Sequence, residues 1–237
     1  MHFEFKEIIA VVVPYFIGVS ALYLFGYWGA FNVNIFEYVG LSDIAKLSIY
    51  PLLASLVFVF VFSGFLIAEL LISPVFPPGG GNASAVGRFY QKYERGLLAA
   101  MVALGVGAAL FGQEPGRWFC IALIVGTFSS PLHRNEWIIR KVPDPRIRAT
   151  LLSLALLLPG VSFAYGKLEA YLIKTGHPTN IVDVERSKLS LSADQKHPVS
   201  VLGFIGDTYV FFESKSGQVV YVKQFDSTPL YVTPKDR

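Results

Sequence analysis

Residues Leu47–Ile72 read LSIYPLLASLVFVFVFSGFLIAELLI and contain a single charged residue, Glu69. About 20 predominantly apolar residues are enough to cross the hydrocarbon core of a bilayer, so this stretch predicts a membrane-spanning helix. The composition agrees, because 53% of the chain is hydrophobic and only 16% is charged, whereas soluble domains average about 25% charged residues. The sequence therefore predicts an integral membrane protein in contact with the lipid bilayer.

Four further apolar segments predict a polytopic α-helical membrane domain over residues 1–175. They cover about Ile8–Ala30, Gly96–Gly112, Trp118–Leu132 and Ala149–Ile173. The third and fourth segments in chain order, which begin at Gly96 and Trp118, are at or below the usual length of about 17–25 residues for a span. We interpret them either as two thin spans or as one re-entrant hairpin buried inside the protein. Either interpretation returns the chain to the same side of the membrane before the last segment.

Residues 176–237 change to short runs rich in Val, Tyr and Phe, which are typical of β-strands. The predicted strands are Ile181–Glu185, Val199–Ile205, Thr208–Glu213, Gln218–Lys223 and Pro229–Thr233. Gly206-Asp207 fits a two-residue hairpin turn, and Lys215-Ser216-Gly217 fits a second tight connection. A module this small buries few residues completely, so we expect it to pack against the membrane helices, the outward loops or a copy of itself.

The loops between the apolar segments differ in positive charge. The N-terminus and the loops on its side of the membrane carry nine Lys or Arg residues: Lys6, Arg88, Lys92, Arg95, Arg134, Arg140, Lys141, Arg146 and Arg148. The loops on the other side carry Lys46 and Arg117. Because positively charged loops stay in the cytoplasm, we expect a cytoplasmic N-terminus and an extracytoplasmic β module. The small size of the chain suits a bacterial inner-membrane protein.

Six of these basic residues are candidate contacts for a cytoplasmic protein partner or for anionic lipid. They lie in the two inner loops and are Arg88, Lys92, Arg95, Arg134, Arg140 and Lys141.

Small residues recur at every fourth position in the two short segments. They are Ala99, Ala103 and Gly107 in the third segment and Ala122 and Gly126 in the fourth. This spacing lets two helix backbones approach closely in lipid. We interpret these residues as the packing face of a tight hairpin between the two segments, and the alternative is a subunit interface in a homo-oligomer.

Two features inside the apolar segments are candidates for a gating role. Glu69 is a carboxylate in a long apolar run, and Pro159-Gly160 interrupts the last segment. A charge inside a bilayer is costly and marks a functional candidate, and proline removes a backbone hydrogen bond and bends a helix. The structural alternatives are a surface ion pair between Glu69 and a nearby basic residue and a fixed bend at Pro159.

The chain has no pattern typical of catalysis, cofactor binding or metal binding. Its histidines are scattered, and it has no His-x-x-x-His or Cys-x-x-Cys spacing. The single cysteine, Cys120, lies in an apolar segment. From Pro178 onward seven Lys or Arg residues balance seven Asp or Glu residues, so the net charge of +3 does not indicate nucleic-acid binding. We predict neither an enzyme nor a nucleic-acid-binding protein, and no cofactor.

Two functions remain after these exclusions. The first is a membrane interaction, sensor or accessory subunit whose outer β module binds or monitors a partner, for example in a defence or immunity role. The second is a homo-oligomeric ion channel or small transporter that uses Glu69 and the bend at Pro159-Gly160. Few ionisable residues lie within the apolar segments, so a pore would have to form between several copies of the chain.

Overall fold

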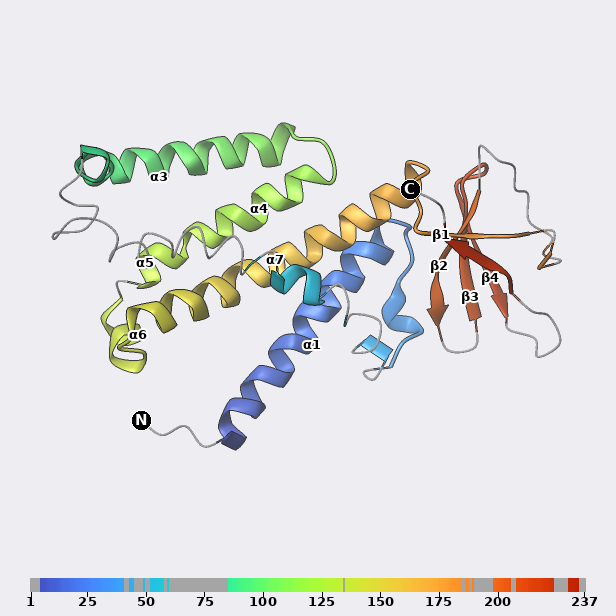
Figure 1. Ribbon diagram of the computed structural model, residues 1–237, viewed down its shortest axis with the longest axis horizontal. Coiled ribbons are helices and arrows are strands. Elements are labelled where there is room, and N and C mark those ends of the chain that lie inside the picture. The colour runs from blue at the N-terminus through green and yellow to red at the C-terminus, as the bar shows by residue number, and fades with distance from the viewer. Residues whose placement is uncertain are drawn as a thin grey trace.

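A computed structural model describes residues 5–40, 43–44, 49, 52–57, 59, 85–133, 135–184, 186–187, 189, 198–205, 208–223 and 230–234. Within these residues a set of helices is followed by a C-terminal antiparallel sheet (Figure 1). This order confirms the predicted helical region and the β module that follows it. Glu69 and most of the predicted segment Leu47–Ile72 lie outside the described residues.

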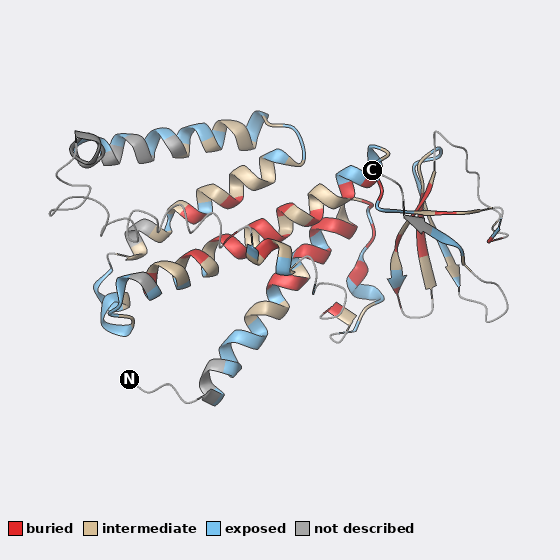
Figure 2. Cartoon of the chain, viewed as in Figure 1, coloured by how far each residue is buried: buried red, intermediate tan, exposed pale blue. Residues whose placement is uncertain are grey.

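Two long helices, α1 (Phe5–Gly29) and α7 (Pro145–Lys174), form the axis of the molecule (Figure 1). Their segments Ile9–Gly29 and Ile147–Lys174 are long and apolar enough to cross a membrane. Only 28% of the first and 39% of the second apolar window is buried inside the protein. Figure 2 shows the exposed N-terminal half of α1, where Val11 is 71% exposed. Apolar helices that keep so much surface outside the core fit association with a membrane.

The two long helices touch backbone to backbone near their C-terminal ends. A Cβ atom added to Gly26 of α1 would lie 2.4 Å from the carbonyl oxygen of Phe163. A Cβ atom added to Gly166 of α7 would lie 2.4 Å from the carbonyl oxygen of Tyr23 and 2.8 Å from the amide nitrogen of Tyr27. Each helix therefore presents a glycine to the other's backbone, which is how small residues permit close helix packing in membranes.

From residue 85 to residue 141 the described chain forms the helices α3 (Ala85–Phe111), α4 (Gly116–Thr127), α5 (Ser129–His133) and α6 (Glu136–Lys141). The chain folds back after α3, so that α4 packs between α3 and α7 (Figure 1). The apolar parts of α3 and α4, Val102–Phe111 and Gly116–Thr127, are shorter than a span. Of the five predicted apolar segments, the described residues thus support spanning length for the first and the last.

The C-terminal sheet has the strand order β4-β3-β2-β1-β5, and every pair is antiparallel. Its strands are β1 (Asn180–Val182), β2 (Val199–Ile205), β3 (Thr208–Glu213), β4 (Gln218–Lys223) and β5 (Val232–Pro234). The bounds of the three central predictions are confirmed to the residue.

The turn between β3 and β4 needs a glycine. Gly217 has φ = +71°, and its amide donates to the carbonyl of Glu213 at 2.9 Å. This left-handed conformation is easy for glycine and strained for other residues, and it confirms the predicted connection at Lys215-Ser216-Gly217. The other predicted turn, Gly206-Asp207, lies outside the described residues.

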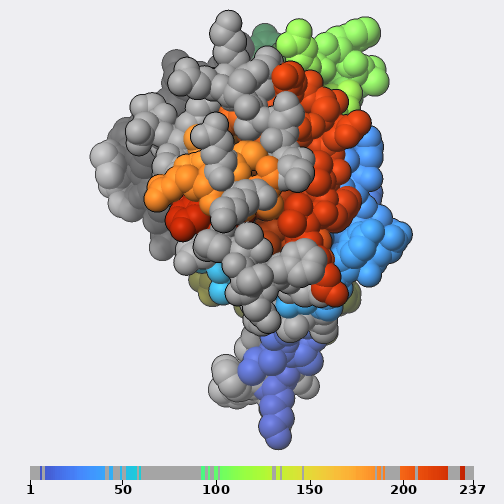
Figure 3. Space-filling model, turned by 90° about the vertical axis from the view of Figure 1, so that its right-hand side faces the viewer, coloured from blue at the N-terminus to red at the C-terminus, as the bar shows by residue number. Residues whose placement is uncertain are grey.

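The sheet packs on the C-terminal ends of α1 and α7. One apolar cluster joins residues of α1, the following loop, α7, β2 and β3. Within it, the rings of Phe31 and Phe212 lie 5.2 Å apart. The loop after α1 contributes Ile35, 1% exposed, from the 3-10 helix η1 (Ile35–Glu37). Figure 3 looks onto the sheet, below which the N-terminal part of α1 projects. The expectation that the β module packs against the helices is confirmed, and the loop after α1 takes part in the same cluster.

Candidate functional site

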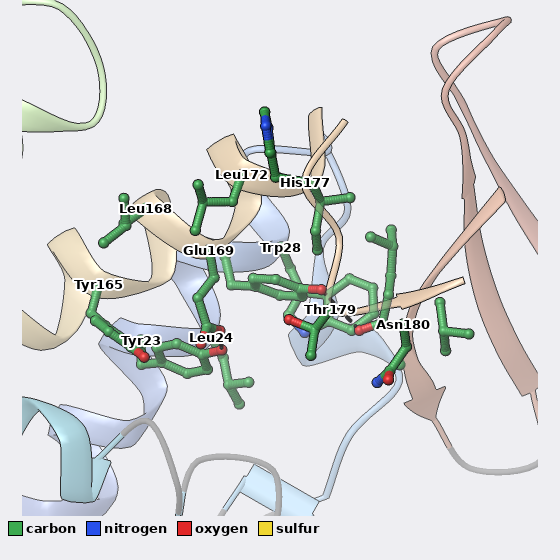
Figure 4. A pocket seen from close by; sticks show the side chains of 15 residues that line it. Tyr23, Leu24, Trp28, Tyr165, Leu168, Glu169, Leu172, His177, Thr179 and Asn180 are labelled. Atoms are coloured by element: carbon green, nitrogen blue, oxygen red, sulfur yellow. Dashed lines mark hydrogen bonds between the residues drawn. The ribbon is translucent and has the colours of Figure 1, made fainter. Parts of the chain in front are cut away.

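A cavity of about 350 Å³, which we call the junction cavity, lies where α1, α7 and the sheet meet (Figure 4). Its walls come from three parts of the chain that are distant in sequence. The lining residues are Tyr23, Leu24, Tyr27 and Trp28 of α1, Tyr165, Leu168, Glu169, Leu172 and Ile173 of α7, and His177, Thr179, Asn180, Val201, Leu202 and Gly203. An occupant of this cavity would contact both the long helices and the β module.

Glu169 is the carboxylate of the cavity, and two tyrosines lie beside it. The Tyr23 hydroxyl donates to Glu169 Oε2 at 2.5 Å, and the Tyr165 hydroxyl lies close to the same carboxylate. In Figure 4 the three side chains converge from α1 and α7. The spacing explains the convergence, because Tyr165 and Glu169 are four residues apart and so share one face of α7.

The charge of Glu169 has no ion-pair partner among the described residues. The neighbouring lysines of α7 are engaged elsewhere. Lys167 Nζ lies 5.9 Å from the centre of the Phe163 ring, and Lys174 donates to the carbonyl of Ala30. His177 lines the rim, but in Figure 4 its imidazole points away from Glu169. A half-buried carboxylate held by a hydroxyl donor alone keeps its negative charge available to a ligand.

Aromatic rings form the wall beside this carboxylate. The rings of Tyr23 and Tyr27 stack with centroids 6.1 Å apart, and the Trp28 ring meets Tyr27 edge to face at 5.3 Å. Aromatic residues four apart, as Tyr23 and Tyr27 are, lie one above the other on a helix. The faces of such rings carry partial negative charge.

Two contacts tie this aromatic wall to the sheet. The buried hydroxyl of Tyr27 donates to the carbonyl of Leu202 in β2 at 3.0 Å. A Cβ atom at Gly203 would lie 3.1 Å from Cζ2 of Trp28, so the absence of a side chain there lets β2 approach α1. The pairing of β2 with β3 is irregular at the same place, since the register shifts between Val201 and Gly203. Helix α1 and strand β2, which both line the cavity, are therefore joined by a hydrogen bond and by a close packing contact.

Five of the six candidate basic contacts belong to helices α3 and α6, which are remote from the sheet (Figure 1). Arg88, Lys92 and Arg95 belong to α3, and the side chain of Lys92 is exposed. Arg134 lies outside the described residues, as do the side chains of Arg88 and Arg95.

On α6 the basic residues make local contacts at an exposed surface. Arg140 lies 3.7 Å from Glu136, and Lys141 Nζ lies 5.7 Å from the centre of the Trp137 ring. The structure does not bring these two to the junction cavity.

The small residues of α4 face α7. A Cβ atom at Gly126 would lie 2.1 Å from Leu157 Cδ2, and one at Gly160 would lie 2.8 Å from Ala122 Cβ. Pro159 and Gly160 are inside the continuous helix α7, and Gly160 gives Ala122 room to approach.

The small residues of α3 have a different setting. Ala99 and Ala103 are exposed, and a Cβ atom at Gly107 would meet no described residue within 4 Å. It is Gly105 that faces α4, since a Cβ atom there would lie 2.7 Å from Ile124 Cγ1. A subunit interface at Ala99, Ala103 and Gly107 stays a prediction.

The sequence reasoning missed Glu169 and the tyrosines around it. Glu169 lies near the end of an apolar segment and between Lys167 and Lys174, a setting typical of solvated helix ends. A signal was present in the spacing, because Tyr23 with Tyr27 and Tyr165 with Glu169 are each four residues apart.

Comparisons of the chain with protein-family models, with curated proteins and with solved structures find no match. Within the part of the chain that is described, no group of three His, Cys, Asp or Glu residues is placed to hold a metal ion. The cavity thus brings together one carboxylate, phenol hydroxyls and aromatic rings.

Proposed function

We propose that the protein is an integral membrane binding or sensor subunit whose β module, outside the cytoplasm, binds or monitors a ligand or partner. The observation that carries this proposal is the junction cavity, whose walls are shared by α1, α7 and β2. A ligand that touches several elements at once stabilises the arrangement in which all of them meet. As an accessory subunit of a larger membrane system, including one with a defence or immunity role, the protein would bind its ligand or partner in this way.

The proposed topology places the β module and the basic helices on opposite sides of a bacterial inner membrane. The sheet lies at one end of the long helices, and α5 and α6 lie at the other (Figure 1). This separation supports the positive-inside argument from nine basic residues against two. In the proposed polytopic arrangement, the segment Leu47–Ile72 and the pair α3 and α4 complete the membrane domain beside α1 and α7.

The long helices are suited to carry a signal between the two ends. They contact each other through Gly26 and Gly166 immediately beside the cavity. At the far end of α7, the buried Arg148 donates from Nη1 to the carbonyl of Val142 at 2.7 Å and to that of Pro143 at 3.2 Å. These bonds fix the connection between α6 and α7. A shift of α7 at the cavity would therefore move the basic surface of α6 with it.

The alternative is a homo-oligomeric channel or small transporter. Its two sequence candidates are Glu69, which lies outside the described residues, and the bend at Pro159-Gly160. Gly160 is packed on Ala122, as described above. The described residues thus supply no observation that favours a pore.

Native mass spectrometry of the tagged chain, extracted gently from its own membranes, tests the proposal. A second, different component bound in defined stoichiometry supports a sensor or accessory subunit. A symmetric homo-oligomer with nothing else bound, together with ion flux through reconstituted liposomes, would contradict it and establish the channel.

A further inference from the structure

We propose that the junction cavity binds an alkylammonium group, held by the Glu169 carboxylate against the aromatic wall of Tyr23, Tyr27 and Trp28. This inference rests on the proposal that the cavity is the ligand site of the protein, and it names the chemical class of the ligand. The ammonium group belongs either to a lipid head group or to a small soluble amine.

The carboxylate supplies the charge for this recognition. Glu169 accepts a hydrogen bond from Tyr23, and no Lys, Arg or His among the described residues pairs with it. An ionised carboxylate has about four lone-pair sites, so the Tyr23 hydroxyl leaves acceptor capacity for a further donor. The Tyr23 hydrogen bond also fixes the carboxylate in place, which lowers the entropic cost of binding a cation.

The aromatic wall selects an organic cation over a hydrated inorganic one. Tyr23, Tyr27 and Trp28 line the cavity on the α1 side, and Glu169 lines it on the α7 side. The three rings also contact one another, by stacking of Tyr23 on Tyr27 and edge to face between Tyr27 and Trp28. Ammonium groups bind to the faces of tryptophan and tyrosine rings when they lie within about 6 Å of the ring centre. The ring faces also accommodate the carbon atoms attached to the nitrogen, which an inorganic cation lacks.

The position of the cavity explains how a lipid could supply the ammonium group. Glu169 lies near the end of the apolar segment Ile147–Lys174, at the level where a spanning helix meets the head groups. Leu168 and Leu172 line the same cavity on α7, and Leu172 is 40% exposed. A phosphatidylethanolamine head group could enter beside Glu169 while its chains follow this apolar edge of α7. The volume of about 350 Å³ also admits a small soluble amine.

The test uses the full chain in nanodiscs made of phosphatidylglycerol, which has no ammonium group. Ethanolammonium is titrated by calorimetry, and ethylene glycol serves as the uncharged probe of similar shape. Glu169→Gln removes the charge and keeps the shape of the side chain. Glu136→Gln removes the same charge from exposed α6 and is the matched control. Thermal unfolding of each variant establishes that it is folded.

Separate nanodiscs containing phosphatidylethanolamine and phosphatidylglycerol in equal amounts test the lipid source. Native mass spectrometry then measures which lipid stays bound to the wild-type chain and to each variant. Ethanolammonium binding without lipid preference identifies a soluble amine as the ligand. Selective retention of phosphatidylethanolamine identifies the lipid head group.

We expect the wild-type chain to bind the ammonium group in one of these two experiments. The affinity should fall about 10- to 100-fold in Glu169→Gln, because hydrogen bonds to charged groups are the strong ones. The affinity should stay unchanged in Glu136→Gln. The inference would be overturned if the wild-type chain binds ethanolammonium and ethylene glycol equally and also retains the two lipids equally. This outcome needs only the wild-type chain, so it holds even if Glu169→Gln fails to fold. Undiminished ammonium binding by a folded Glu169→Gln would overturn it as well. If either negative result is found but a second component is still bound in native membranes, the ammonium inference fails and the proposed sensor function stands. The failure of the inference can therefore be told from the failure of the proposed function.

Discussion

Two glycines of the α1–α7 pair, Gly26 and Gly166, and two glycines of α3, Gly96 and Gly107, have opposite surroundings. In the pair, Gly26 and Gly166 have no room for a side chain, because each would meet the backbone of the other helix at 2.4 Å. In α3, an added Cβ atom at Gly96 or Gly107 would meet nothing within 4 Å among the described residues. The same residue type therefore occurs at a close backbone contact beside the cavity and at open positions of α3, the helix that ends at Phe111, which is 88% exposed.

The largest expected effect comes from adding a side chain at Gly166, which has no room for one. Gly166→Ala places a methyl group against the backbone of Tyr23 and Tyr27 and forces α1 and α7 apart. Overpacking of this kind costs up to about 3 kcal/mol of stability. Thermal unfolding in a mild detergent measures the loss.

Gly107→Ala is the matched control for that experiment. Alanine favours a helix over glycine by about 0.5–1 kcal/mol, and position 107 has open space, so the variant should be as stable as the wild type or slightly more so. A Gly166→Ala protein that unfolds at the same temperature as Gly107→Ala would remove the contrast between the two regions.

A smaller effect is expected from the hydrogen bond that joins α1 to β2. Tyr27→Phe leaves the buried carbonyl of Leu202 without its hydroxyl donor, which costs about 1–3 kcal/mol. Hydrogen exchange of the β2 amides should become faster while exchange in α3 stays unchanged. The exposed Tyr38 provides the control, since Tyr38→Phe should leave β2 exchange as it is. Equal protection of β2 in both variants would show that the hydrogen bond does not hold the sheet.

The smallest effect concerns the contact between β4 and the loop after α1, where the rings of Tyr38 and Tyr221 lie 6.1 Å apart. Burial raises the pKa of the Tyr221 phenol above its ordinary value of about 10, and the neighbouring Tyr38 and Glu37 raise it further. Because the folded protein binds this proton more tightly than the unfolded chain, its contribution to stability is complete below about pH 10 and is lost as the pH rises through the raised pKa. Stability between about pH 9 and pH 11 should therefore decline less in Tyr221→Phe than in the wild type. Identical declines in the two proteins would contradict the contact.

The sequence predicted the three central strands of the β module well because they are short, rich in Val, Tyr and Phe, and, between β3 and β4, separated by turn residues. Gly217 shows this, since a tight turn between two β runs needs a residue that tolerates positive φ. The apolar segments at α1 and α7 were also recognisable, because length and hydropathy alone identify them.

The candidate site could not be found in the same way. The cavity depends on how α1, α7 and β2 meet, and Glu169 is separated by 146 positions from its hydrogen-bond donor Tyr23. Periodicity places Tyr23 and Tyr27 on one face of a helix, but it does not say which helix they face. The small residues of α4 illustrate the same limit, because Ala122 and Gly126 pack on α7, although the spacing alone favoured α3 as their partner.

Labelling of single cysteines on intact cells tests most directly the claim that a membrane separates the β module from the basic helices. In a Cys120→Ala background, Lys215→Cys places a thiol in the exposed turn between β3 and β4, and Lys141→Cys places one at the exposed end of α6. A membrane-impermeant maleimide should label position 215 on intact cells and position 141 only after the membrane is opened. Labelling of position 141 but not 215, or of both alike, would contradict the account.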